Sequence, residues 1–184
     1  MKINLEQIYK ELQAWREERG ITAQSQKDGY IVNVMEEFGK LASALRLLEK
    51  SKRVKDIHEI KCAEHFISDA LCDISVFTIN AGADIPCDFK VTEIFYPKAN
   101  DSINAELNFL IERVAHFNKA IIFGDYPKDT AIYFNSILQK CADICKLYGL
   151  NFENAMLENI KEISSLTGKE DKVKADYEKA RIKK

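Results

Sequence analysis

The sequence predicts an all-α protein, an antiparallel bundle of about six helices. Glycine and proline are scarce, with seven and three residues among 184, so few points interrupt the chain. Apolar residues recur at intervals of three and four, for example at positions 31, 34, 35 and 38, which places them on one side of a helix. Long helices of this kind bury their apolar sides against one another, and this arrangement gives a bundle.

The helices expected in the first half of the chain share this spacing and cover 4–20, 28–48 and 57–81. Asn4 is the expected N-cap of the first helix, and Gly20 ends it. The polar segment 21–27 and the charged segment 49–56 are expected to be exposed connections. The third helix ends at Gly82 and is apolar nearly all round in its later part, so it is expected to be the most buried.

The second half begins with a connection at 83–104 that contains two prolines and the alternating piece FKVTEIFY, which is typical of extended chain. The helices expected after it cover about 105–122, 129–148 and 151–166. An Asp-Ile pair recurs, in LCDISVFTINAGADI and in CADICKLYGLNF. The second and third helices form one helix pair, and the fourth and fifth form another. Either the two pairs are copies of one hairpin, or they are alike by chance.

Composition limits the class of protein. Apolar residues make up 46% and charged residues 30%, and the net charge is −2, so no broad basic surface favours nucleic acid. No run of apolar residues is long enough for a membrane span, and the start lacks an apolar leader. Five cysteines without a CxxC pair favour reduced thiols, and we expect a cytoplasmic protein.

Asp73 is the strongest chemical signal, because it is the only charged residue between Ala70 and Ala83 in an otherwise apolar helix. A buried carboxylate without a partner costs several kcal/mol, so such a group is normally paired or bound to metal. Asp69 lies one turn earlier and Asn80 two turns later. The sequence leaves two interpretations open, an ion pair with another helix and a metal ligand.

Glu36 and Glu37 form a second acidic signal in the preceding helix. A helical wheel places Glu37 at the edge of the apolar side and Glu36 nearly opposite. Glu37 is therefore expected to face Asp73 across two antiparallel helices. Carboxylates bind hard cations such as Mg²⁺ or Mn²⁺, which neutralise polyphosphate and lower the pKa of a bound water.

Two stretches resemble the MazG-like, all-α nucleoside triphosphate pyrophosphohydrolase superfamily, which includes dimeric dUTPases and phosphoribosyl-ATP pyrophosphohydrolases. They are WREERGITAQSQKDGYIVNVMEEFGKLASALR and DALCDISVFTINAGADI. The stretches NFENAMLENIKEISSLTGK and KADYEKAR are similar to the end of phage-type members. The family motif is EExxE on one helix and ExxD, or a DxxxD-like variant, on the next. The similarity covers about 10–82 and 147–180.

The resemblance implies a bundle of the family's type, with one domain at 1–168, an inserted second hairpin at about 83–146, and a basic tail at 169–184. It implies hydrolysis of a nucleoside triphosphate to the monophosphate and pyrophosphate with Mg²⁺ or Mn²⁺, and the implied substrate is a dNTP. The implied metal ligands are Glu36, Glu37, Asp69 and Asp73. The implied nucleotide contacts are Asn80, Lys40 and Lys174, and the catalytic set is Glu37, Asp73 and Lys40. Family members often associate, so a homodimer is one expected state.

Two positions depart from the family motif. Lys40 stands at the third Glu of EExxE, and Ala70 stands at the Glu of ExxD. A protonated lysine cannot bind Mg²⁺, although its ammonium can replace a cation or hold a phosphate oxygen. The alternatives are therefore a degenerate nucleotide-binding or sensing module without significant turnover, and a structural bundle whose Asp73 is ion-paired.

Overall fold

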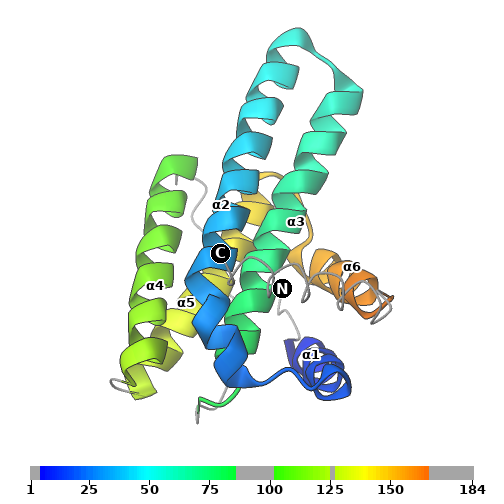
Figure 1. The fold of residues 1–184 in the computed structure, drawn as a ribbon. Coiled ribbons are helices and arrows are strands. Elements are labelled where there is room, and N and C mark those ends of the chain that lie inside the picture. The colour runs from blue at the N-terminus through cyan, green and yellow to red at the C-terminus, as the bar shows by residue number, and fades with distance from the viewer. Residues whose placement is uncertain (1–4, 86–101, 125–126, 166–184) are drawn as a thin grey trace, which may run out of the picture.

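The computed structural model describes residues 5–85, 102–124 and 127–165, and within these residues all regular structure is helical (Figure 1). The helices are α1 (Leu5–Arg19), α2 (Ala23–Val54), α3 (Ile57–Ala81), α4 (Ile103–Phe123), α5 (Pro127–Leu147) and α6 (Phe152–Ser165). For this described part of the chain the expected all-α class, with about six helices, is confirmed. Asn4, the stretch 86–101 with most of the expected connection, and the tail at 169–184 lie outside the described residues.

The long helix α2 differs from expectation at both ends. It begins at Ala23 rather than near Asp28, because the Thr22 side chain caps it by accepting a hydrogen bond from the Ser25 amide at 3.2 Å. It also runs through the charged segment that was expected to be a link and ends at Val54. Exposed lysine, arginine and glutamate are good helix formers, so charge alone does not end a helix. The expected loop at 21–27 and link at 49–56 were therefore too long, since only 21–22 and 55–56 lie outside helices.

The other boundaries follow the expected ones closely. The link to α3 consists of Lys55, in a left-handed conformation at φ 56°, and Asp56, whose carboxylate accepts from the Glu59 amide at 3.0 Å. α3 covers 57–81, as the sequence predicts. α5 begins two residues early, at Pro127, since proline is tolerated in a first helical turn.

Two helical hairpins pack side by side (Figure 1), α2 with α3 and α4 with α5, and α1 and α6 cover the opposite side of α3. One aromatic contact joins the hairpins, with the rings of Tyr30 in α2 and Phe117 in α4 5.2 Å apart. Within the second hairpin, the rings of Phe117 and Phe134 lie 6.0 Å apart. The hydroxyl oxygens of Tyr30 and Thr78 lie 3.1 Å apart and form a buried hydrogen bond between α2 and α3. Tyr30 therefore connects α2 both to α3 and to the second hairpin.

α3 lies at the centre of this arrangement and has more buried residues than any other helix for which burial is given, which confirms the expectation from its composition. Its buried side chains include Ile67, Leu71 and Ile74, each fully inaccessible. No helix in the described ranges is both long enough and apolar enough to cross a membrane. The apolar surface of α3 is used instead for packing against four other helices, α1, α2, α5 and α6.

Candidate functional site

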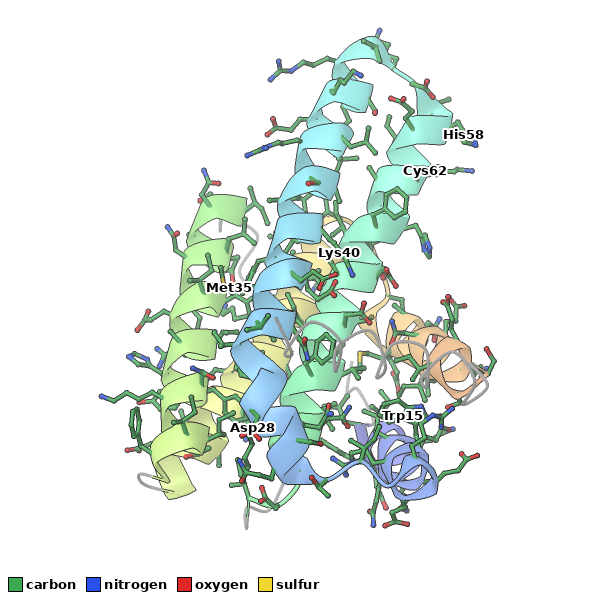
Figure 2. The ribbon with its side chains drawn as sticks, in the orientation of Figure 1. Trp15, Asp28, Met35, Lys40, His58 and Cys62 are labelled. Carbon is green, nitrogen blue, oxygen red and sulfur yellow. The ribbon has the colours of Figure 1, made fainter. Side chains whose placement is uncertain are left out.

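Glu37 of α2 is the most buried acidic residue of the first hairpin. Its exposed fraction is 3%, whereas the side chain of Glu36 is 69% exposed, as the helical wheel predicts. Lys40, one turn further along α2, donates to Glu37 Oε1 at 2.8 Å and lies 3.6 Å from Glu36 Oε1. Figure 2 shows Lys40 midway along the α2–α3 hairpin. The second carboxylate oxygen, Glu37 Oε2, is buried and has no hydrogen-bond partner in the described part of the chain.

Asp69 and Asp73 approach the same region from α3, and a third helix completes it. Asn159 of α6 donates from Nδ2 to Asp73 Oδ1 at 3.0 Å and lies 3.5 Å from Asp69 Oδ1. Asn159 is 9% exposed, and its Oδ1 atom has no hydrogen-bond partner among the described residues. We use the term acidic site for Glu37, Asp69, Asp73, Lys40 and Asn159 together.

Burial changes the acidity of this site. It raises the pKa of Asp73 to about 6; the hydrogen bond from Asn159 lowers that pKa, and the charges of Glu37 and Asp69 raise it. Burial also raises the pKa of Glu37, against the opposing effect of the hydrogen bond from Lys40. The hydrogen bond to Glu37 in turn raises the pKa of Lys40. A site of this kind favours binding a positive charge, which would keep both carboxylates ionised.

The donor set fits a magnesium ion in part. No group of three or more His, Cys, Asp or Glu side chains within the described ranges is arranged to hold a metal ion on its own. Mg²⁺ usually takes only one or two carboxylates and completes its shell with water and substrate phosphates. The unpaired Glu37 Oε2 and the carboxylate of Asp73 supply that number from two adjacent helices.

Asn80 occupies a different place from the acidic site. It is 1% exposed at the end of α3, and its backbone oxygen accepts a hydrogen bond from Arg16 of α1 at 3.3 Å. Its side-chain Oδ1 is buried without a hydrogen-bond partner in the described structure. The other expected nucleotide contact, Lys174, lies outside the described residues.

Sequence reasoning did not identify Asn159, although a signal was present. Met156 and Ile160 are fully buried on the apolar side of α6, and Asn159 follows Met156 by three residues on that same side. A polar residue at a core position normally has a specific partner. Which partner it has depends on how α6 packs on α3, and the helical spacing does not contain that information.

Comparison with protein-family models, with curated proteins and with solved structures finds no match for this chain. The MazG-like resemblance therefore stays a prediction from the motif residues.

The raised pKa of Asp73 predicts how stability depends on pH without divalent cations. The folded state binds this proton with a pKa of about 6, against about 3.9 in an unfolded chain. The stabilisation from the proton is complete below about pH 3.9 and is lost as the pH rises through 6. We expect the free energy of unfolding in EDTA to fall by up to about 3 kcal/mol from this group between pH 4 and 7.5.

Urea unfolding of wild type and Asp73→Asn at several pH values measures this contribution by difference. The neutral amide cannot titrate, so the free energy of unfolding of the variant should increase relative to that of wild type as the pH rises. A constant difference between the two proteins over this range would contradict the assignment.

Proposed function

We propose that this chain hydrolyses a nucleoside triphosphate to the nucleoside monophosphate and pyrophosphate with Mg²⁺ or Mn²⁺. The expected substrate is a deoxyribonucleoside triphosphate (dNTP). The observation that supports this most is the pairing of Glu37 and Asp73, two carboxylates with raised pKa on adjacent helices, beside the ammonium of Lys40. Carboxylates bind the cation, and a cation with an ammonium binds polyphosphate. The motif resemblance gives the same reaction class.

In this proposal Glu37 and Asp73 hold the cation, with Asp69 beside them, and the bound ion supplies charge neutralisation and an acidified water. Asn159 keeps its hydrogen bond to Asp73, which orients that carboxylate and favours its ionised form. The side chain of Lys40 is half exposed, so its ammonium can move from Glu37 to a phosphate oxygen of a substrate bound at the solvent-facing edge of the acidic site. Glu36 lies at the same edge and neutralises Lys40 until substrate binds.

A second candidate function is nucleotide binding without significant turnover. The observation that favours it is the ion pair of 2.8 Å between Lys40 and Glu37, since Lys40 stands where the family motif has a third carboxylate. The purely structural alternative required Asp73 to be ion-paired with another helix. Within the described residues its hydrogen-bond partner is instead the neutral amide of Asn159.

The direct test is a screen of the common ribo- and deoxyribonucleoside triphosphates with Mg²⁺ and with Mn²⁺, scored for pyrophosphate and for monophosphate. Release of both products in equal amounts from at least one triphosphate supports the proposed reaction. Nucleotide binding without product, measured by calorimetry under the same conditions, supports the second candidate. Absence of both binding and product would contradict both.

Asn159→Ala should weaken cation binding without abolishing it. The change removes the hydrogen bond that favours ionised Asp73, and a hydrogen bond to a charged group contributes about 1.5–3 kcal/mol, so we expect an affinity loss of about tenfold or more. Titration with Mn²⁺ measures the loss. Asn154→Ala, an exposed position on the same helix, is the matched control. Equal cation affinity of the two variants would show that Asn159 has no role in the site.

A further inference from the structure

The second hairpin contains its own buried charge cluster. Glu106 of α4 and Asp143 of α5 are 4% and 3% exposed. The ammonium of Lys140, also on α5, lies 2.8 Å from Glu106 Oε2 and 3.0 Å from Asp143 Oδ2. Gln139 donates to the other oxygen of Asp143 at 2.6 Å. We call Glu106, Lys140 and Asp143 the sealed cluster.

The sealed cluster occupies the same place in its hairpin as the acidic site does in the first. Asp73 follows Glu37 by 36 residues, and Asp143 follows Glu106 by 37. Three of the four buried residues after each glutamate keep equal intervals of 4, 11 and 14 positions, and they are Leu41, Leu48 and Ser51 in α2 and Leu110, Phe117 and Ala120 in α4. The fourth pair differs by one position, with Ala44 at an interval of 7 and Val114 at an interval of 8. Before each aspartate the intervals also agree, with Ile67 and Leu71 in α3 and Ile137 and Cys141 in α5. Helical periodicity alone gives most of these intervals, so they establish equivalent positions in the two hairpins without deciding between copies and chance.

The two places differ in how their negative charge is neutralised. In the first hairpin Lys40 comes from the glutamate helix, donates a hydrogen bond to Glu37 Oε1, and lies 3.6 Å from the exposed Glu36. Glu37 Oε2 makes no hydrogen bond within the described structure. In the second hairpin Lys140 comes from the aspartate helix and lies between both carboxylates. Its side chain is 19% exposed, against 49% for Lys40. Glu106 Oε2 also makes no hydrogen bond among the described residues, but it is in ionic contact with Lys140. One ammonium thus contacts both carboxylates of the second place, whereas no ammonium contacts Asp73 within the described residues of the first.

We propose that the Lys140 ammonium takes, in the second hairpin, the position that a divalent cation takes in the first. The chain then has one working cation site, and loss of Lys140 turns Glu106 and Asp143 into a second. The comparison of the two hairpins rests on the proposed function. Two buried carboxylates left without their ammonium are strongly unfavourable, and a hard divalent cation is the ligand that they select.

The test measures only the second hairpin, because Asp73→Asn removes the first site from every protein compared. The variants are Asp73→Asn alone and Asp73→Asn combined with Lys140→Met. The control is Asp73→Asn combined with Lys119→Met, at an exposed position of the same hairpin. Thermal melting is recorded in EDTA and in 10 mM Mn²⁺. We expect Mn²⁺ to raise the melting temperature by about 3 °C or more only in the protein that carries both Asp73→Asn and Lys140→Met.

Each outcome decides the proposal. Folding of the Lys140→Met protein only when Mn²⁺ is present is the same result in a stronger form. A folded protein without a Mn²⁺ shift, or an unfolded protein that Mn²⁺ does not rescue, overturns the proposal. Wild type against Asp73→Asn tests the first site separately, so failure of the proposed function and failure of this inference give different results.

Discussion

Asp73→Asn should remove the stabilisation of the fold by millimolar Mg²⁺ or Mn²⁺ and lower pyrophosphate release by about 100-fold or more. The amide has nearly the same shape as the carboxylate but carries no charge, so the acidic site loses a cation ligand without loss of volume. Without cation the variant should melt at a higher temperature than wild type near pH 7.5, because the cost of burying the Asp73 charge and the repulsion from Glu37 and Asp69 are both relieved. The measurements are melting temperature with and without cation, and product release.

Glu36→Gln is the matched control for this prediction. Glu36 belongs to the same motif, but its side chain is 69% exposed and its ionic contact is with Lys40 at 3.6 Å. Exposed ion pairs contribute little, so we expect wild-type melting and a loss of activity well below that of Asp73→Asn. Full activity of Asp73→Asn, or an equal loss in the two variants, would contradict the assignment of Asp73 as the central ligand.

The fold was predictable to the extent that local patterns determine it. The range of α3 was predicted closely, because its apolar later half ends at Gly82, whereas the cap at Asp56 was identified only in the structure. The start of α2 was missed since residues 23–27 are polar, and polarity is common to loops and to exposed helix. The cap at Thr22 was the signal that distinguished the two, with its side chain placed to accept from the Ser25 amide.

The acidic site was predictable only within the first hairpin. The positions of Glu37 and Lys40 follow from helical spacing along one helix, and the approach of Asp73 follows from two consecutive antiparallel helices. The contribution of Asn159 depends on α6, which is separated from α3 by the whole second hairpin. Helical periodicity gives the buried side of each helix but not which other helix covers it.

Lys40 separates the proposed enzyme from a nucleotide-binding relative without turnover. Its ammonium neutralises Glu37 at 2.8 Å, yet the side chain is half exposed and can reach a ligand at the solvent-facing edge of the acidic site. If that ammonium binds polyphosphate, Lys40→Ala should weaken nucleotide affinity by about tenfold, since a charge-assisted hydrogen bond contributes about 1.5–3 kcal/mol. Lys50→Ala, at an exposed position further along α2, should have no effect. Calorimetric titration with nucleotide measures the affinities.

Lys40→Glu completes the comparison, because it restores the EExxE pattern and replaces a competing cation by an oxygen ligand. Cation affinity should rise in this variant under either function. Turnover distinguishes them. We expect an active wild type and impaired release of pyrophosphate in both Lys40 variants, since the ammonium that steadies the polyphosphate is lost in each. If wild type releases no pyrophosphate and the Lys40→Glu protein does, Lys40 replaced a catalytic ligand. The chain would then bind nucleotide without hydrolysing it.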